Sequence, residues 1–293
     1  MVMTRFECMR KIGGYVRLMR PVNCLMMGFA VIVGAALASP DIFGNLWQNL
    51  IYGFVTGFML TAASMAINDY YDKEIDAINE PTRPIPSGLI KPEEALVFAF
   101  FLTVIGFIAA FLINTTSPLC FVTAVISLAV STAYVTVGKK TGLLGNFLVS
   151  FCVAVPFLYG NLAATNAIVP NVLIFASMAF LSNTGREITK GIVDAEGDSV
   201  RNIQTIAVRH GEKKAAVAAV LFYLSAVLLS PIPWLLTVVS FWFIPLVAIT
   251  DFGLVASSLM LLEDYSRGNA RKVKNIVLFW FIVGLLAFVV GSL

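Results

Sequence analysis

The sequence has few charged residues and few of the side chains that build histidine or cysteine metal sites. Charged residues make up 13% of its 293 positions, whereas soluble domains carry about 25%. It contains one histidine, His210, and four cysteines that form no CxxC pair. These counts exclude a histidine metal centre and a cysteine cluster, so we expect the cysteines to be small apolar packing residues.

Apolar residues dominate the composition of the chain. They make up 59% of the chain, and apolar runs of about 20 residues, the length that crosses a bilayer, recur along it. We therefore predict an all-α, polytopic membrane protein forming a single domain over 1–293. Nine transmembrane helices are predicted, at 21–39, 46–67, 93–113, 118–137, 143–163, 170–186, 213–230, 234–262 and 273–292.

The basic residues predict the orientation of these spans. The connections that contain no Lys or Arg are 40–45, 114–117, 164–169 and 231–233. All the cations lie in the other connections and at the N-terminus, which the positive-inside rule makes cytoplasmic. Residues 1–20 carry cations and an apolar face spaced as in a helix, which predicts an amphipathic helix on the membrane surface. We expect a multi-pass protein of the cell membrane.

The acidic residues gather in two connections on the same side. Segments 68–91 and 186–212 hold ten of the seventeen acids, and we expect them to form acidic cytoplasmic loops that cap an active site. In the first, Asn68, Asp72 and Asp76 are four residues apart, and so are Asp194 and Asp198 in the second. Side chains with this spacing share one helix face, where like charges repel.

A hard divalent cation would offset that repulsion. Mg²⁺ typically takes one or two carboxylates and completes its shell with water and substrate phosphate. Charged segments are often only solvated, but two with the same spacing make that reading less favourable. An acidic ring in a cation channel is the other alternative, and the cations interleaved with these acids argue against it. Acids and bases together suit metal ions and a phosphate group.

The two segments resemble the signatures of a known family. NDYYDKEIDAINEPTRPIPSG, from Asn68 to Gly88, resembles the first signature of the UbiA-type intramembrane prenyltransferases, NDxxDxxxD followed by a loop that ends in RPIPSG. DAEGD, from Asp194 to Asp198, resembles their second signature, DxxxD, and RPVNC resembles the start of their first helix. The resemblance covers the whole chain and implies a helical bundle around a central, lipid-accessible chamber.

The resemblance also implies roles for single residues. It implies Mg²⁺ sites at Asn68, Asp69, Asp72, Asp76, Asp194 and Asp198, with Asp72, Asp76, Asp194 and Asp198 as the catalytic residues. A family lysine that contacts diphosphate follows a YxxxK pattern, but here the spacing from Tyr134 is one residue longer, so Lys139 and Lys140 both remain candidates. With them, the candidate substrate-binding residues on this side are Asn23, Arg83, Lys139, Lys140, Arg186 and Lys190.

Within the family, the lead-in REITKGIVDAEGD is most similar to the archaeal ether-lipid branch. This similarity implies geranylgeranyl diphosphate as the donor, geranylgeranylglyceryl phosphate as the acceptor and a diether lipid phosphate as the product. Membrane lipid is then a partner, and no nucleic acid is expected. An aromatic or other acceptor is the alternative within the family.

A secondary transporter is the alternative from another class. Asp251 lies deep within the predicted span 234–262, and transporters place charges near the bilayer midplane. The other charges lie at one face, however, which favours an enzyme. We expect Asp251 to make a structural hydrogen bond, because no second intramembrane charge is present to form a relay.

Overall fold

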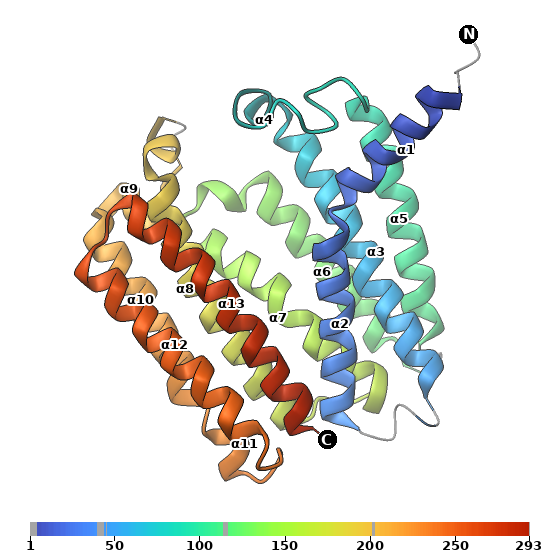
Figure 1. Cartoon of the computed structure of the whole chain (residues 1–293). Coiled ribbons are helices and arrows are strands. Elements are labelled where there is room, and N and C mark those ends of the chain that lie inside the picture. Colours follow the sequence, from blue (N-terminus) through green and yellow to red (C-terminus); the bar gives the residue numbers. More distant parts are fainter. Residues whose placement is uncertain (1–4, 40–43, 45, 114–116, 201–202, 293) are drawn as a thin grey trace.

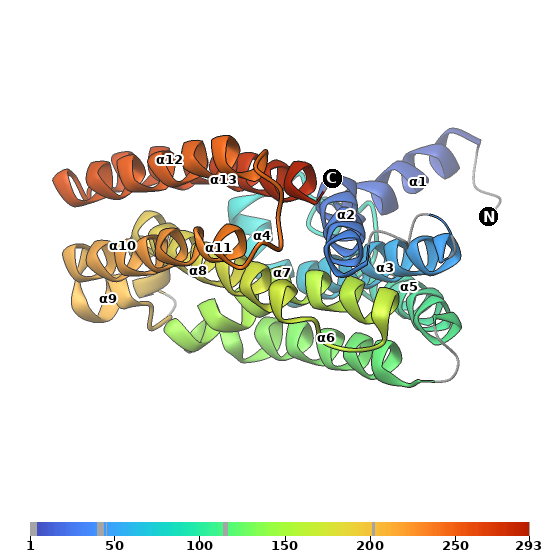
Figure 2. The same cartoon turned by 90° about the horizontal axis from the view of Figure 1, so that it is seen from below.

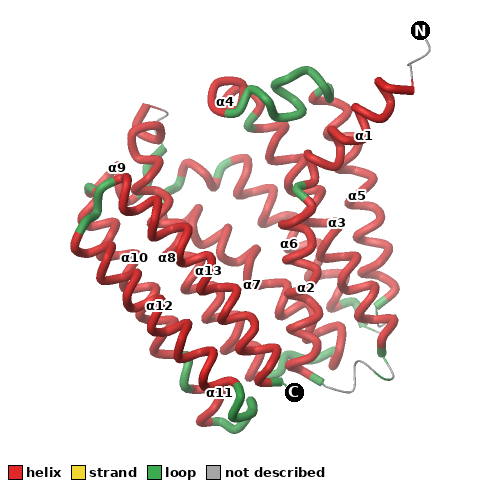
Figure 3. Tube along the Cα trace, viewed as in Figure 1, coloured by secondary structure: helices red, strands yellow, loops and turns green. Residues whose placement is uncertain are grey.

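The computed structural model describes residues 5–39, 44, 46–113, 117–200 and 203–292. All regular secondary structure in these residues is helical, as Figure 3 shows. The elements are α1 (Arg5–Met19), α2 (Pro21–Ala38), α3 (Trp47–Tyr71), α4 (Lys73–Asn79), α5 (Pro92–Leu112), α6 (Leu119–Thr136), the 3₁₀ turn η2 (Gly138–Lys140), α7 (Leu143–Thr165), α8 (Pro170–Val200), α9 (Ile206–His210), α10 (Glu212–Leu229), α11 (Ile232–Leu235), α12 (Phe243–Glu263) and α13 (Arg267–Gly291).

Six helices form a closed ring. Each packs against the next in the order α2, α3, α6, α7, α8 and α13, and α13 returns to α2. α5 supports the ring behind α3, while α10 packs behind α8 and α12 behind α13. Figure 2 shows α12 and α13 as one layer beside α8 and α10. This arrangement encloses a central space between helices that are distant in sequence.

Close backbone contact joins α2 to α7. A Cβ atom on Gly34 would lie 2.1 Å from the Phe157 carbonyl oxygen, and one on Gly160 would lie 1.9 Å from that of Val31. Small residues allow membrane helices to approach this closely. The two glycines therefore hold α2 directly against α7, across the ring.

The all-α membrane fold predicted from the sequence is confirmed. Among the described residues, eight helical stretches are long and apolar enough to cross a membrane: α2, α3, α5, α6, α7, Glu212–Leu235, α12 and α13. Large apolar side chains on their outer faces are exposed, including Phe100, Phe111 and Phe252. Exposure of this kind suits lipid rather than water.

One of the nine predicted spans, 170–186, is not among these eight stretches. These residues lie in α8, which packs within the ring but is not among the eight apolar stretches. Its inward side carries Asn183, Arg186 and Glu187, and these polar side chains line the central cavity. They lower the hydropathy of the segment, so nine crossings remain a prediction. Figure 1 places α1 and the C-terminus at opposite ends of the bundle, as an odd number would require.

Two predicted boundaries are wrong. The span 234–262 begins at Phe243 rather than at Trp234, because Thr237 has a left-handed backbone (φ 56°) that interrupts the helix after α11. The acidic segments 68–91 and 186–212, which were predicted as loops, are also partly helical. Residues 68–71 end α3, residues 73–79 form α4, and residues 186–200 continue α8.

The N-terminal helix predicted over 1–20 is present as α1, and residues 1–4 lie outside the described residues. Met9, Ile12 and Val16, from the predicted apolar face, have exposed side chains. Leu18, in contrast, is fully buried against the bundle. A position on the membrane surface stays a prediction that this exposed apolar face supports.

Candidate active site

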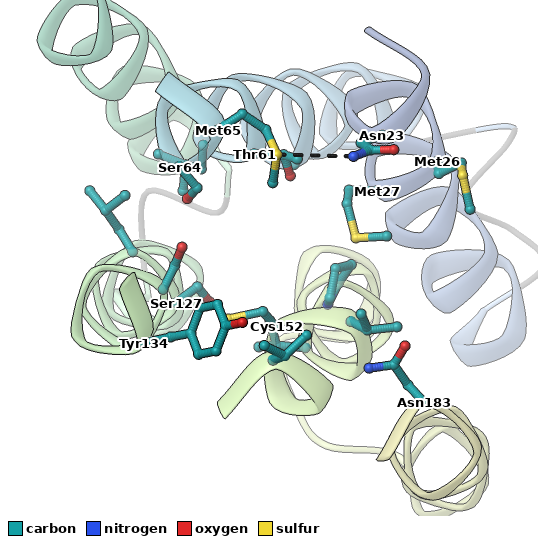
Figure 4. A pocket seen from close by; sticks show the side chains of 18 of the residues that line it. Asn23, Met26, Met27, Thr61, Ser64, Met65, Ser127, Tyr134, Cys152 and Asn183 are labelled. Carbon is teal, nitrogen blue, oxygen red and sulfur yellow. Dashed lines mark hydrogen bonds between the residues drawn. The ribbon is translucent and has the colours of Figure 1, made fainter. Parts of the chain in front are cut away.

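A cavity of ≈ 450 Å³ lies inside the ring of helices. Residues of α2, α3, α6, α7, α8 and α13 line it, and Figure 4 shows side chains from several of these helices pointing into it. Along α3 its lining extends from Asn68 to Thr56, a rise of about 18 Å in an α-helix. One end of the cavity therefore meets the acidic segments and the other reaches deep into the bundle.

The two ends differ in chemistry. Asn68, Tyr134, Arg186 and Glu187 lie at the end near the acidic segments. Farther along, the walls combine apolar side chains with a few hydroxyl groups: Met27, Val31, Leu60, Ser127, Val153 and Tyr159. An ionic end joined to an elongated apolar chamber suits an amphiphile with an anionic head and a hydrocarbon chain.

Lys139 joins the first acidic segment at this ionic end. Its Nζ atom donates hydrogen bonds to Asn68 Oδ1 (2.8 Å) and Asp72 Oδ2 (2.5 Å), and Asn68 Nδ2 also donates to Asp72 Oδ2 (2.9 Å). Of the two lysines left open by the sequence, Lys139 contacts these side chains, while Lys140 is exposed and makes no ion pair with a described residue. Contact of Lys139 with diphosphate stays a prediction.

The position of Lys139 depends on the turn that carries it. Residues Gly138–Lys140 form η2, and Gly142 follows with φ 64°. A Cβ atom on Gly142 would lie 2.2 Å from the Gln204 carbonyl oxygen. The turn is therefore packed against the second acidic segment, while its Lys139 contacts the first, so it holds both segments near one another.

Arginines hold the other acids of the first segment. Arg83 pairs with Asp76 at 2.6 Å and approaches Asp69 at 3.8 Å, while Arg20 pairs with Asp69 at 2.5 Å. Asp69 and Asp76 are both buried. Burial opposes the charged form of Arg83, but its hydrogen bond to Asp76 and the nearby charges of Asp76 and Asp69 raise its pKa above the ordinary value. Three acids and three cations therefore form a charge-balanced cluster around Asn68.

The second segment meets the same cavity through α8. Glu187 pairs with both Arg186 and Lys190 at 3.3 Å. Among the described residues, the Nε atom of Arg186 is buried without a hydrogen-bond partner. The charge of Glu187 outweighs burial and, with Tyr134, Asp194 and the Glu187 hydrogen bond, raises the pKa of Lys190 above its usual range. The Lys190 side chain is therefore protonated and positively charged near neutral pH.

Asp194 and Asp198 lie farther along α8. Asp194 is exposed and interacts electrostatically with Lys190 on its own helix and with Lys274 on α13. Asp198 is half-buried on the next turn. Tyr134 lies near both segments, because its hydroxyl interacts electrostatically with Asp72 of the first and with Glu187 and Lys190 of the second. The structure thus brings together Asn68, Tyr134, Arg186 and Glu187 around one cavity and places Asp194 and Asp198 beyond its rim.

The site fits the predicted Mg²⁺ by the chemistry of its donors. Among the described residues, no group of three or more His, Cys, Asp or Glu side chains could hold a metal ion unaided. Mg²⁺ needs only one or two protein carboxylates when substrate phosphate supplies further oxygens. Asn68 Oδ1 and Asp72 Oδ2 already converge on a cation, the Lys139 ammonium group. These two oxygens would hold the metal, together with the diphosphate.

Several residues near the site were not predicted from the sequence. Arg20 and Glu187 make ion pairs there, and Tyr134 lines the cavity. The left-handed backbone of Arg20 (φ 53°) turns the chain between α1 and α2, and no local pattern signals its partner 49 residues away. Asn23 lines the cavity, and its Nδ2 atom lies 4.0 Å from Met65 Sδ (Figure 4). Its role in substrate binding stays a prediction.

Asp251 has the structural hydrogen bond expected from the sequence. It accepts a hydrogen bond from Ser230 Oγ, which joins α12 to the end of α10. Asp251 is not among the residues that line the cavity. It therefore supports a helix contact and takes no part in the site.

Comparisons with known proteins agree with this geometry. The model of the UbiA prenyltransferase family matches residues 27–285. Digeranylgeranylglyceryl phosphate synthase from Archaeoglobus fulgidus is 39% identical over 294 aligned positions, covering 97% of this chain and 98% of that protein.

Solved structures share the fold. A structure described as digeranylgeranylglyceryl phosphate synthase in membranes aligns with a TM-score of 0.81 and 32% identity, covering 96% of this chain and 98% of the other. A UbiA homolog from Archaeoglobus fulgidus bound to GPP and Mg²⁺ aligns with a TM-score of 0.65 and 18% identity, covering 94% of this chain and 99% of the other. The second likeness is one of fold alone.

Proposed function

Since the chain belongs to the UbiA prenyltransferase family, we propose that it transfers a geranylgeranyl group from geranylgeranyl diphosphate to the free hydroxyl of geranylgeranylglyceryl phosphate. The products are digeranylgeranylglyceryl phosphate and diphosphate. The chain is a multi-pass membrane prenyltransferase, so the transporter alternative is wrong. The near full-length identity to digeranylgeranylglyceryl phosphate synthase supports this acceptor over an aromatic one.

The observation that carries the proposal is the cavity with one ionic end. Asn68, Arg186 and Glu187 lie at that end, and Met27, Val31 and Leu60 lie farther in. The diphosphate of the donor would lie against the first acidic segment, with its chain in the apolar chamber. The apolar walls of this chamber would exclude water and so protect from hydrolysis a carbon that gains positive charge.

The reaction exchanges one carbon–oxygen bond for another. The bond from the allylic carbon to the diphosphate breaks, the diphosphate leaves with the electron pair, and the acceptor oxygen bonds to that carbon as its proton is released. Mg²⁺, when bound, stabilises the negative charge that develops on the leaving diphosphate. Asn68 and Asp72 would hold the metal, and Lys139 would shift from Asp72 to the diphosphate oxygens.

The remaining residues would position these groups. Arg83 and Arg20 hold Asp76 and Asp69 in place, which keeps the end of α3 and the start of α4 in one geometry. Asp194 and Asp198 would complete the metal and diphosphate site from α8. We place the active site on the cytoplasmic side, because Lys139, Arg83 and Lys190 all lie in connections that the positive-inside rule assigns there.

The test is product formation by the purified full chain in detergent. Geranylgeranyl diphosphate and Mg²⁺ are supplied with geranylgeranylglyceryl phosphate or with 4-hydroxybenzoate, and products are identified by mass spectrometry. We expect the diether phosphate in the first reaction and no prenylated product in the second. Prenylation of 4-hydroxybenzoate alone would favour the aromatic alternative and reject the proposed acceptor.

A further inference from the structure

Two cations on α13, Arg271 and Lys274, have no role in the reaction as described so far. Arg271 is exposed and Lys274 is half-buried near the start of the helix. Leu278 and Phe281, one and two turns farther along, line the central cavity. Positions 271, 274, 278 and 281 follow the three- and four-residue spacing that places side chains on one helix face. Lys274 and Arg271 therefore continue the cavity wall of α13 toward its ionic end.

The facing helix presents a matching row. α8 contributes Asn183, Arg186 and Glu187 to the cavity, and Lys190 lies one turn beyond. α13 packs directly against α8 through a shared buried cluster. That cluster includes Ile188, Ile192, Ala270, Val273 and Val277. The apolar contact fixes the two charged rows beside each other.

These rows gather positive charge. Lys274 interacts electrostatically with four charged side chains: Asp194, Lys190, Arg186 and Arg271. Of these four, three are cations and one is a carboxylate. Glu187, shared between Arg186 and Lys190, and Asp198, one turn beyond Asp194, are further acids on α8, so four cations face three acids. Like charges at close range repel, so an anion would stabilise this cluster.

The charge balance differs from that of the first segment. There, Asp69, Asp72 and Asp76 meet Arg20, Arg83 and Lys139 one to one. Carboxylates are what a Mg²⁺–diphosphate complex requires. A cluster with excess Lys and Arg instead suits a phosphate group that binds without a metal. The buried Nε atom of Arg186, unpaired among the described residues, is one donor available to such a group.

We propose that Lys274 and Arg271, with Arg186 and Lys190, bind the phosphate monoester of the acceptor. Its hydrocarbon chain would lie along Leu278 and Phe281, on the same face of α13. A phosphate monoester carries a charge of about −1.5 to −2 at neutral pH and offers three strong acceptor oxygens. The inference rests on the proposed function, because it takes a phosphorylated lipid as the acceptor, and it assigns the α13 cations to selecting that acceptor.

The test compares Lys274→Gln and Arg271→Gln with Lys272→Gln in the full chain. Lys272 is an exposed cation on the same helix. It interacts electrostatically with Asp264, in the turn before α13. The KM of each substrate is measured in non-ionic detergent. Binding of geranylgeranylglyceryl phosphate and of its dephosphorylated form is measured by calorimetry without donor. Thermal unfolding shows whether each variant is folded.

Lys274→Gln should raise the acceptor KM and the Kd of the phosphorylated acceptor by about 10- to 100-fold, the usual effect of losing a charge-assisted hydrogen bond. Arg271→Gln should raise both by up to about 5-fold, because exposed charges are screened. The donor KM, and binding of the dephosphorylated acceptor, should not change. Lys272→Gln should match the wild type, and added phosphatidylglycerol should not compete.

Other results would overturn the proposal. If Lys274→Gln raised the donor KM alone, the cluster would bind diphosphate. If Lys274→Gln weakened binding of both acceptor forms equally, or behaved as Lys272→Gln does, Lys274 would not recognise the phosphate group. Effective competition by phosphatidylglycerol would indicate a general headgroup site. Failure of the proposed function looks different: the wild type would bind the phosphorylated acceptor in a Lys274-dependent way but would not prenylate it.

Discussion

Replacement of Asp72 by Asn separates the chemistry of the site from the stability of the fold. Asp72 accepts hydrogen bonds from Lys139 at 2.5 Å and from Asn68 at 2.9 Å. The side chains of Lys139 and Asp72 are 25% and 18% exposed, so solvent screens the pair only in part and loss of its charge should cost about 1 kcal/mol, the upper end of the range for surface pairs. The amide oxygen of the replacement side chain can still accept both hydrogen bonds. Thermal unfolding should therefore change little.

Turnover should fall far more. The proposed reaction needs the Asp72 charge to hold the metal that stabilises the departing diphosphate, and loss of one such electrostatic contact typically lowers kcat by about 10²- to 10³-fold. Diphosphate release from geranylgeranyl diphosphate, with acceptor and Mg²⁺ present, measures this rate. Glu74→Gln is the matched control, because Glu74 is an exposed acid two residues away and makes no ion pair with a described residue. If Asp72→Asn retained the rate of Glu74→Gln, the role assigned to Asp72 would be refuted.

The remaining predictions concern the second segment, the metal, the helix packing and the orientation. Asp198→Asn should also lower turnover by about 10²-fold or more, and an unchanged rate in diphosphate release would exclude Asp198 from the reaction. Excess EDTA should abolish activity and added Mg²⁺ should restore it; full activity in EDTA would contradict the metal assignment. Gly160→Ala should destabilise the bundle by about 1–3 kcal/mol through overpacking, because its Cβ atom would meet the Val31 carbonyl oxygen at 1.9 Å, and an unchanged melting temperature would contradict this. In sealed vesicles of a chain without its native cysteines, cysteines at positions 139 and 166 should react from opposite sides, and labelling from one side would break the predicted topology.

The sequence predicted the helical membrane class, and it predicted that the two acidic segments belong together. Asn68 and Glu187 do line one cavity. Acids repeated every four residues at the end of an apolar span are a local signal that requires no knowledge of packing. The charge pattern also favoured an enzyme over a transporter, and the family match confirms that choice.

Features that depend on distant contacts could not be predicted in this way. The choice between Lys139 and Lys140 depends on a single 3₁₀ turn, which directs Lys139 toward Asp72. The pairing of Arg20 with Asp69 joins residues far apart in the chain. The sequence placed a span at 170–186 but not the continuation of α8 to Val200, because polar residues follow the apolar stretch. For Lys139 and Arg20, the residue type could be identified from the sequence but its partner could not.

The most direct measurement is a competition assay read by mass spectrometry. The purified chain receives geranylgeranyl diphosphate, Mg²⁺ and equal concentrations of geranylgeranylglyceryl phosphate, its dephosphorylated form and 4-hydroxybenzoate. We predict that digeranylgeranylglyceryl phosphate dominates the products and that omitting Mg²⁺ removes it. A predominantly prenylated aromatic product, or equal use of the phosphorylated and dephosphorylated acceptors, would contradict the proposed function.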